Sequence, residues 1–178
     1  MKSWFLILLV VLLSMQVRAQ QVPHYTVWVD GLLNAQLPKS SFYSLGTGLR
    51  VEASRPLRNP TRALFVQLGY AHLFRKSTSA FTADAALLNV GYRYQSHRAF
   101  GASLGVGAQY WREQLRINFP DGAVAENLDS VLPSMTLGFG FRVRTHYQLG
   151  LENRLLLKSE SGSVRLRDHA VLTAGYTF

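Results

Sequence analysis

AVLTAGYTF, residues 170–178, is the stretch of the sequence that decides the fold. Every second residue from Ala170 to Phe178 is apolar, and most of the positions between them are small or polar. Because successive side chains of a β-strand point to opposite faces, this alternation predicts a strand with one apolar face. The predicted strand ends on an aromatic side chain of that apolar face.

The same alternation recurs in eight runs, which are separated by polar segments that contain Pro, Gly or Ser. The runs are 24–33, 42–53, 62–74, 81–95, 99–112, 131–143, 147–158 and 167–178. Strands of this length with turn signals between them favour an all-β meander over a fold that alternates strands and helices. We therefore predict an eight-stranded antiparallel up-and-down transmembrane β-barrel.

The first 19 residues have the composition of a cleaved secretory signal peptide. Lys2 supplies the positive start, an apolar run extends from Trp4 to Leu13, and Ala19 offers a small residue for cleavage. The apolar run is shorter than the roughly 20 residues of a membrane-spanning helix, which favours a signal peptide over an uncleaved anchor. Residues 20–178 then form the barrel domain. The sequence has no cysteine, which excludes disulfides, a thiol nucleophile and a lipid-modified cysteine.

The composition of the two faces indicates which of them meets water. A soluble, lipocalin-like carrier turns its apolar face inward around a ligand and carries many Lys and Glu outside. Here the middle of the polar face is mainly Gly, Ser, Ala, Thr and Gln, which suits the crowded interior of an eight-stranded barrel. We therefore expect the apolar face to point outward, toward lipid, with a lipocalin-like carrier as an alternative.

Aromatic residues of the apolar face gather near the ends of the runs, around a band of Leu, Val and Ala. Two aromatic girdles of this kind are typical of barrels that face lipid. If both termini lie in the periplasm, the longer connections fall outside the cell, as in such barrels. The predicted girdle residues are Tyr25, Tyr43, Tyr70, Phe74, Tyr92, Tyr94, Phe100, Tyr110, Phe141 and Tyr147.

In these features residues 22–178 resemble the small outer-membrane β-barrel proteins of the OmpA/OmpX type. The resemblance implies an integral protein of the outer membrane of a diderm bacterium, without the periplasmic domain of OmpA. It also implies that the last strand is the signal read by the outer-membrane barrel-assembly machinery, because a terminal strand offers an edge for strand addition and an aromatic for a pocket. The assembly-signal residues are Leu172, Ala174, Tyr176 and Phe178.

Charged residues also occur on the face that is predicted to line the lumen. They are Asp30, Arg50, Glu52, Arg93, Arg142, Arg144, Glu152 and Arg154, together with the polar Gln109. Because an unpaired charge is costly in a narrow interior, we expect Glu52 and Glu152 to pair with arginines of neighbouring strands and to plug the lumen. This predicts a structural or interaction role, as an accessory subunit of an envelope complex or a surface-recognition barrel. The alternative is a small, weakly anion-selective pore of the porin family.

The net charge of the chain is +9. In an exported protein this favours anionic lipid over nucleic acid as the partner. Candidate contacts to lipopolysaccharide phosphates are the basic residues of the predicted outer loops: Lys39, Arg75, Lys76, Arg116, Arg165 and Arg167. The segment 113–130 is expected to be a loop that recognises a protein partner, because connections longer than about 12–15 residues are uncommon without a role.

A lipid A-modifying acyl-transfer or hydrolase barrel is a further alternative. Acyl chemistry needs a nucleophile, a base and an orienting group within hydrogen-bond reach. The histidines of the predicted outer rim and their polar neighbours are His72, His169, Ser77, Ser79, Asp84 and Asp168. They lack the His-x-Ser spacing of lipid A deacylase barrels, so we predict no catalytic residues. The residue spacings also predict no cofactor and no metal site.

Overall fold

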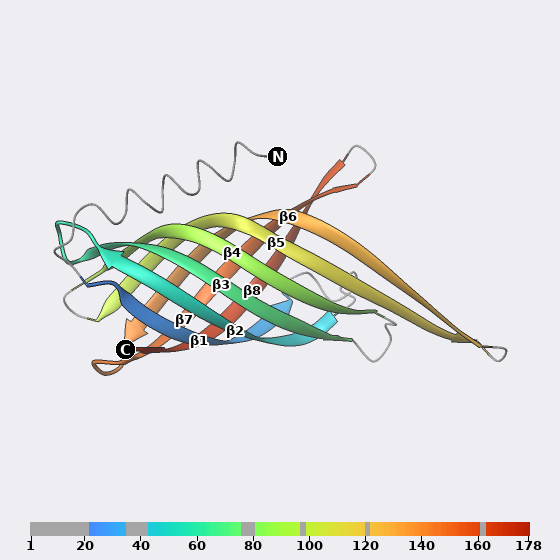
Figure 1. Cartoon of the computed structure of the whole chain (residues 1–178), viewed down its shortest axis with the longest axis horizontal. Coiled ribbons are helices and arrows are strands. Elements are labelled where there is room, and N and C mark those ends of the chain that lie inside the picture. Colours follow the sequence, from blue (N-terminus) through green and yellow to red (C-terminus); the bar gives the residue numbers. More distant parts are fainter. Residues whose placement is uncertain (1–21, 35–42, 76–80, 97–98, 120–121, 161–162) are drawn as a thin grey trace.

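The computed structural model describes residues 22–34, 43–75, 81–96, 99–119, 122–160 and 163–178. They form the strands β1 (His24–Asn34), β2 (Tyr43–Pro56), β3 (Arg62–Arg75), β4 (Phe81–Gln95), β5 (Phe100–Phe119), β6 (Gly122–Arg142), β7 (Tyr147–Glu160) and β8 (Ser163–Thr177). Each strand pairs with the next and β1 pairs with β8, all antiparallel, so that the sheet closes into a barrel (Figure 1). The predicted eight-stranded antiparallel barrel is confirmed. None of the described residues forms a helix that is long and apolar enough to cross a bilayer.

The seam between the first and the last strand has a continuous register. Thr26 lies opposite Thr177 near one end of the seam, and Asn34 lies opposite His169 at the other. The backbone N–H of Phe178 donates to the carbonyl of Tyr25 at 2.9 Å and extends the seam. Closure in this way pairs the backbone groups that an open sheet leaves exposed on its edges.

The barrel has two different ends, which we call the terminal end and the hairpin end (Figure 1). At the terminal end β1 begins, β8 ends, and short turns join β2 to β3, β4 to β5 and β6 to β7. The β2–β3 turn is closed by the N–H of Leu57, which donates to the carbonyl of Arg62 at 2.8 Å. The β6–β7 turn is closed in the same way by Val143 and Tyr147 at 2.9 Å. These turns hold the terminal end of the barrel compact.

At the hairpin end, β5 and β6 continue as a paired ribbon beyond the rest of the barrel (Figure 1). Their pairing runs without interruption to Phe119, opposite Gly122. The expectation that 113–130 is a loop is therefore wrong, because these residues are the outer parts of two strands. The described side chains of residues 125–129 are all exposed. Both faces of such a ribbon can meet water, so the apolar alternation that marks the barrel wall is not required there.

The β5–β6 ribbon parts from β7 where it leaves the barrel. Pairing between β6 and β7 covers Ser134 to Arg142 of β6, opposite Leu156 to Gln148 of β7. Pro133, which has no backbone N–H to donate, directly precedes this paired segment. Strands β7 and β8 also stay paired out to Glu160, opposite Ser163, which is farther than the sequence predicts.

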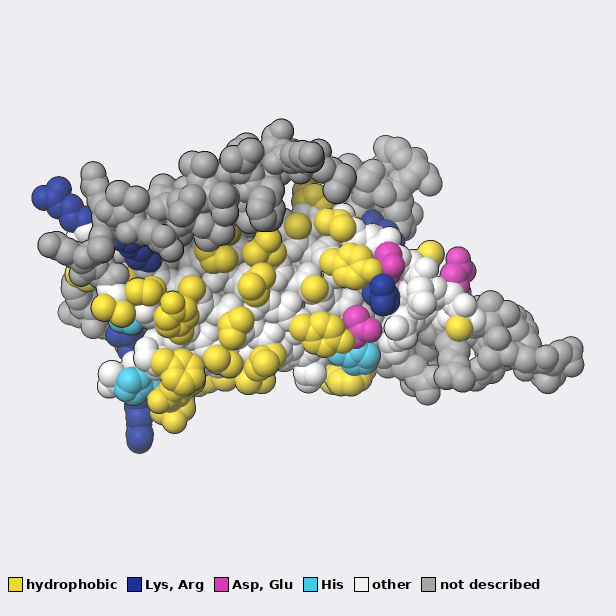
Figure 2. All heavy atoms as spheres, in the orientation of Figure 1, with side chains coloured by type: hydrophobic (Ala, Val, Ile, Leu, Met, Phe, Trp, Pro, Cys, Tyr) yellow, Lys and Arg dark blue, Asp and Glu magenta, His cyan; other side chains and the backbone are white. Residues whose placement is uncertain are grey.

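The barrel wall is apolar outside and polar inside. Val29, Leu68 and Leu151 are 58%, 55% and 51% exposed, and Figure 2 shows hydrophobic side chains spread over the visible wall. By contrast, Asp30 and Arg50 are only 2% and 3% exposed. This is the reverse of a water-soluble protein, in which charged residues are almost never fully buried unless paired. It overturns the lipocalin-like alternative, whose apolar face lines the interior.

Candidate functional site

Six of the eight predicted lumen charges meet in the middle of the barrel. Arg50 and Glu52 of β2 are two residues apart and therefore point to the same side, and Glu152 and Arg154 of β7 repeat this spacing. Single inward charges come from β1 and β4. The complete set is Asp30, Arg50, Glu52, Arg93, Glu152 and Arg154.

Four of these side chains form a closed ring of alternating charge, which we call the charge ring: Asp30, Arg50, Glu152 and Arg154. Arg50 donates from Nη2 to Asp30 Oδ1 at 3.0 Å and from Nη1 to Glu152 Oε2 at 2.9 Å. Arg154 donates from Nη2 to Asp30 Oδ2 at 2.7 Å and from Nε to Glu152 Oε1 at 2.6 Å. Each carboxylate therefore accepts from both guanidinium groups. A buried charge is tolerated when it is paired and hydrogen bonded in this way.

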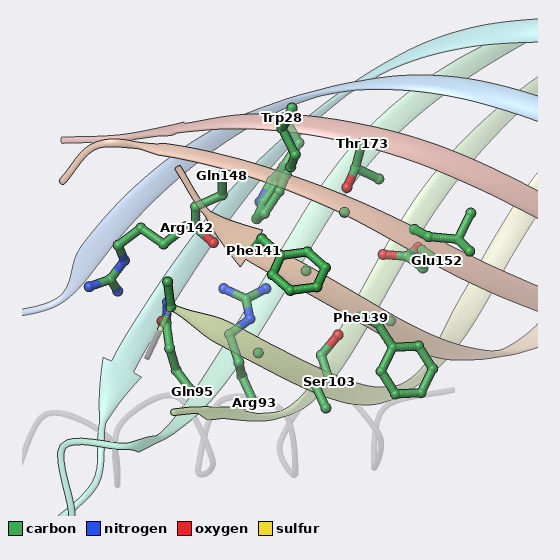
Figure 3. Close-up of a pocket in the computed structure, with 18 of the residues that line it drawn as sticks. Trp28, Arg93, Gln95, Ser103, Phe139, Phe141, Arg142, Gln148, Glu152 and Thr173 are labelled. Carbon is green, nitrogen blue, oxygen red and sulfur yellow. The ribbon is translucent and has the colours of Figure 1, made fainter. Parts of the chain in front are cut away.

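Glu52 and Arg93 form a second ion pair on the side of the terminal end. Arg93 donates from Nη1 and Nη2 to the two oxygens of Glu52 at 2.6 and 2.7 Å, a bidentate geometry. The guanidinium carbon of Arg93 also lies 5.6 Å from the ring centre of Trp28 and 5.2 Å from that of Phe65. Figure 3 shows this guanidinium inside the lumen, near Trp28. Arg93 is therefore held by charge and by two aromatic faces.

Two amide side chains connect this ion pair to the charge ring and to the opposite wall. Gln67 donates from Nε2 to Glu52 Oε2 at 2.8 Å and accepts from Arg50 Nη1 at 3.2 Å. Asn89 donates from Nδ2 to Gln67 Oε1 at 3.2 Å and to Thr136 Oγ1 at 2.9 Å. Gln67 and Asn89 are not among the lumen residues predicted from the sequence. Their inward position on the paired strands β3 and β4 is the signal that could have found them.

The expected pairing with neighbouring strands is wrong. Glu52 of β2 pairs with Arg93 of β4, although β3 lies between the two strands. Glu152 of β7 pairs with Arg154 of its own strand and with Arg50 of β2, from which β8 and β1 separate it. The interior of an eight-stranded barrel is narrow enough for long side chains to meet across it.

Arg142 and Arg144 do not join the network, contrary to expectation. Arg142 is the last residue of β6, Arg144 lies in the following turn, and both side chains are exposed at the terminal end. Figure 3 shows Arg142 extending away from the middle of the lumen. Gln109, which was expected beside the charges, is buried and accepts a hydrogen bond from Trp111 Nε1 at 3.1 Å.

Apolar side chains fill the lumen on the hairpin side of the charge ring, and we call them the apolar layer. They form two clusters, Leu73, Ala83, Ala85, Trp111, Leu132 and Leu156 in one and Leu32, Ala71 and Val171 in the other. Trp111 is 1% exposed and Leu156 is fully buried. This layer is not part of the predicted lumen. Leu32 and Leu156 lie two residues from Asp30 and Arg154 and so share their inward face, which is the signal that could have found it.

Little space remains beside these groups in the lumen. A cavity of about 40 Å³ borders Trp28, Arg93, Ser103 and Thr173 (Figure 3). This is room for very few water molecules, since a water occupies about 30 Å³ of liquid volume. Together the charge ring and the apolar layer form a two-part plug.

Glu113 receives two cations at the mouth of the hairpin end. Arg167 Nη1 contacts Glu113 Oε1, and Lys158 Nζ lies 3.8 Å from Glu113 Oε2. The guanidinium of Arg167 also lies over Trp111, 5.7 Å from the ring centre. Arg167, a candidate contact to lipopolysaccharide, thus has its described contacts with Glu113 and Trp111. The other candidate contacts lie outside the described residues or side chains: Lys39, Arg75, Lys76, Arg116 and Arg165.

The predicted girdle residues lie on the outer wall where their side chains are described. Nine of them are exposed: Tyr25, Tyr70, Phe74, Tyr92, Tyr94, Phe100, Tyr110, Phe141 and Tyr147. The side chain of Tyr43 is not described. Phe100 packs against Phe141, with ring centres 5.5 Å apart. These aromatic side chains flank the aliphatic band at both of its ends.

The four residues of the predicted assembly signal all face outward on β8 or just after it. Leu172 is 56% and Phe178 is 70% exposed, and Ala174 lies between them on the same face. Tyr176 packs edge-on against Tyr147, with 5.2 Å between ring centres, and against Phe178 at 5.0 Å. The stripe therefore continues the terminal-end girdle across the seam of the barrel.

A histidine and a carboxylate meet on the outer wall near the hairpin end. His72 Nδ1 lies 2.8 Å from Asp84 Oδ1, and the hydroxyl of Tyr70 also donates to this oxygen. A hydrolase would need a nucleophile beside this pair. Ser77 and Ser79, the serines near it in the sequence, lie outside the described residues. Within the described part of the chain, no group of three or more His, Asp and Glu could hold a metal ion.

An exposed ion pair joins the bases of the two ribbon strands. Arg112 of β5 donates from Nε to Asp129 Oδ1 of β6 at 3.0 Å and from Nη2 to the hydroxyl of Tyr110 at 3.0 Å. The hydrogen bond from Arg112 lowers the pKa of the Asp129 carboxyl below its ordinary value. Both side chains are about half exposed, so the pair is screened by solvent and contributes little to stability.

No known family profile and no curated protein matches the sequence. Several solved barrels match its fold. The N-terminal β-barrel domain of Pseudomonas aeruginosa OprF matches with a TM-score of 0.64 and 11% identity, over 89% of this chain and 100% of that one. Ail, the attachment invasion locus protein of Yersinia pestis, matches in its complex with the heparin analogue sucrose octasulfate with a TM-score of 0.54 and 13% identity, over 89% and 97%. Ail in a phospholipid bilayer nanodisc gives 0.53 and 9%, over 88% and 100%. At these identities the likeness concerns the fold alone.

Proposed function

We propose that the protein is an integral barrel of the bacterial outer membrane with a closed lumen and a structural or interaction role. The reversal of its two faces carries this proposal, because an apolar wall surrounds a buried network of charges. A bilayer core offers no water to unpaired backbone groups, so only helices and closed barrels can span it. Under this proposal residues 1–19 are a signal peptide that is removed, and the terminal end faces the periplasm.

The plug favours a closed barrel over the anion-selective pore. The central network holds three carboxylates and three guanidinium groups, and each guanidinium is within 3.0 Å of a carboxylate oxygen. No excess of unpaired arginine therefore remains in the network to select anions. Beyond it, the apolar layer replaces the polar lining that a hydrated ion needs.

The membrane and the closed lumen are tested separately. Carbonate extraction of envelope membranes should leave the protein in the pellet, and its gel migration should change on heating, as a folded barrel unfolds. Purified protein in planar lipid bilayers should show no steady single-channel conductance. Release into the carbonate supernatant would remove the membrane assignment, whereas steady conductance would overturn only the closed lumen.

The β5–β6 ribbon supports the interaction role. It extends beyond the barrel, separates from β7 at Pro133, and exposes residues 125–129 to solvent. We propose that a protein partner of the envelope binds this ribbon. In affinity purification from envelope membranes in mild detergent, a stable partner should be retained by the full chain. It should be lost from a variant in which 117–124 are replaced by Asn-Gly, a short turn that keeps Arg116 opposite Ala125.

Recovery of the same partner with both forms would move the contact away from residues 117–124, the outer part of the ribbon. A lone monomer in both cases would instead favour an autonomous barrel.

We also propose that the barrel-assembly machinery reads the outward stripe that ends at Phe178. Replacement of Phe178 by Ser should lower the amount of heat-modifiable protein in the outer membrane, while Leu151→Ser, an equally outward change outside the last strand, should lower it less.

A further inference from the structure

A row of polar side chains crosses the outer wall on the hairpin side of the aliphatic band. Its members lie directly opposite one another on five consecutive strands: Thr47, His72, Asp84, Arg112 and Asp129. Each shares its face with outward apolar residues of its own strand, such as Tyr110 beside Arg112. Figure 2 shows acidic, basic and histidine side chains across the visible wall toward the hairpin end, beside the hydrophobic side chains. Because charges are costly in hydrocarbon, the row lies at the limit of the lipid-facing wall.

Asp84 of β4 and Arg112 of β5 occupy the centre of this row and lie directly opposite each other. Opposite charges at such positions attract one another across a sheet. Here each is instead bonded to its neighbour on the other side, Asp84 to His72 and Arg112 to Asp129. In the part of the chain that the structure describes, Asp84 and Arg112 form no ion pair with each other.

Each of these two side chains keeps one polar group unused. Asp84 is bonded only through Oδ1, which lies 2.8 Å from His72 Nδ1 and accepts from the hydroxyl of Tyr70. Arg112 donates from Nε and Nη2, to Asp129 and to a tyrosine hydroxyl. Among the described residues, Oδ2 of Asp84 therefore has no donor and Nη1 of Arg112 has no acceptor. The two side chains are 28% and 48% exposed, so both groups can be reached from outside.

The wall next to this pair, toward the terminal end, is apolar. In the adjacent outward row the small side chain of Ala86 separates Tyr70 from Tyr110. Leu88, two residues farther along β4, is 41% exposed and continues the apolar surface. A molecule with its polar end at the two charges can therefore lay an acyl chain against the wall. This continuity with the lipid-facing surface favours a lipid over a water-soluble ligand.

We infer that Asp84 and Arg112 bind the head group of a membrane lipid that carries both a phosphate and an ammonium. The phosphate accepts from Nη1 of Arg112, and the ammonium donates to Oδ2 of Asp84. Side chains directly opposite on paired strands have Cβ atoms about 4.5–5.5 Å apart, a spacing that suits the two linked charges of a zwitterionic head group. A purely anionic head group would satisfy Arg112 but would be repelled by Asp84. That the row lies in a membrane rests on the proposed function.

Native mass spectrometry of the folded barrel in detergent micelles tests this site, with phosphatidylethanolamine and phosphatidylglycerol as the added lipids. Both lipids have the phosphodiester, but only the first has an ammonium. The wild type should retain phosphatidylethanolamine at least about fivefold more strongly, since hydrogen bonds to charged groups contribute this much or more. Asp84→Asn, which keeps Oδ1 as an acceptor, should retain both lipids alike. Arg112→Gln should weaken the retention of both.

Two exposed charges away from the row serve as matched controls. Glu126→Gln on the ribbon and Arg144→Gln at the terminal end should retain the lipids as the wild type does. All variants are first shown to be folded by heat-modifiable migration. The inference is overturned if the wild type retains the two lipids equally, or if folded Asp84→Asn keeps the preference. Release of the protein by carbonate would instead contradict the proposed function, whatever the lipid preference in micelles.

Discussion

Arg50 of β2 donates to Glu152 of β7 across the lumen, with 2.9 Å between Nη1 and Oε2. Strands β1 and β8 lie between these two strands, so Arg50 and Glu152 belong to strands that share no backbone pairing. Their contact is a brace across the barrel, added to the ladder of hydrogen bonds around it. The brace is buried, and it therefore depends on both charges being present.

Replacement of Arg50 by Met should destabilise the barrel by about 3–5 kcal/mol, because it leaves Glu152 and Asp30 short of a counter-charge in the lumen. Urea unfolding in lipid vesicles measures this change. The double variant Arg50→Met/Glu152→Leu should recover part of the loss, since Asp30 keeps Arg154. Arg112→Gln, which breaks a solvent-screened pair, should leave the unfolding midpoint almost unchanged. Equal losses for Arg50→Met and Arg112→Gln would contradict the bracing role.

Gly107→Ala should also destabilise the barrel, for a steric reason. A Cβ at position 107 would lie 2.0 Å from the carbonyl oxygen of Leu88 and 2.8 Å from the Cα of Asn89. Backbone cannot move aside as a flexible side chain does, so a loss of about 1–3 kcal/mol is expected. At Gly31 the nearest atom to such a Cβ is 4.0 Å away, and Gly31→Ala should be tolerated. Matching unfolding midpoints for the two variants would refute this account.

Removal of bulk from the apolar layer should open the lumen. Trp111→Ala combined with Leu156→Ala leaves a cavity in the buried cluster to which both side chains belong. We expect conductance steps in planar bilayers that the wild type lacks, together with a stability loss of several kcal/mol; Trp→Ala alone costs about 3–5 kcal/mol. Leu151→Ala, on the outer wall, is the control and should stay silent. A silent Trp111→Ala/Leu156→Ala barrel would show that the charge ring closes the lumen by itself.

Asp129 should titrate below the ordinary range of an aspartate. Its pKa is lowered in the folded protein by the hydrogen bond from Arg112, so the ion pair is intact above the ordinary pKa and is lost as the pH falls through the lowered value. Carbon NMR of labelled aspartate follows this titration. Arg112→Gln should raise the pKa of Asp129. An unchanged titration in that variant would mean that Arg112 does not hold the carboxylate in solution.

The barrel wall could be predicted from the sequence because lipid imposes a regular alternation. From Leu64 to Tyr70, for example, every second residue must be apolar, and this pattern fixed both the strand and its outward face. The turns at the terminal end agree with the sequence prediction for a related reason, because polar turn residues interrupt the alternation abruptly there. Beyond the wall lipid no longer imposes this alternation, so the sequence of the β5–β6 ribbon does not distinguish paired strands from a loop.

The interior could be predicted only in part. Alternation shows that Glu52 and Arg93 both face inward, but their meeting depends on how far the strands are staggered when the barrel closes. No single strand carries that information. The apolar layer could not be predicted from a rule that expects only polar side chains in the lumen. Leu156 and Trp111 occupy inward-facing positions of their strands but are apolar.

Pro133 lies on β6 at the boundary between the barrel wall and the β5–β6 ribbon. The pairing between β6 and β7 ends beside Pro133. Beyond this point the ribbon is joined to the wall through the pairing of β5 with β4, which continues to Leu115 opposite Phe81. Residues can be inserted into or removed from the ribbon in opposing pairs without altering the register of the closed sheet. The surface at this end can thus diverge rapidly, or accept a grafted epitope, while the lipid-facing wall stays the same.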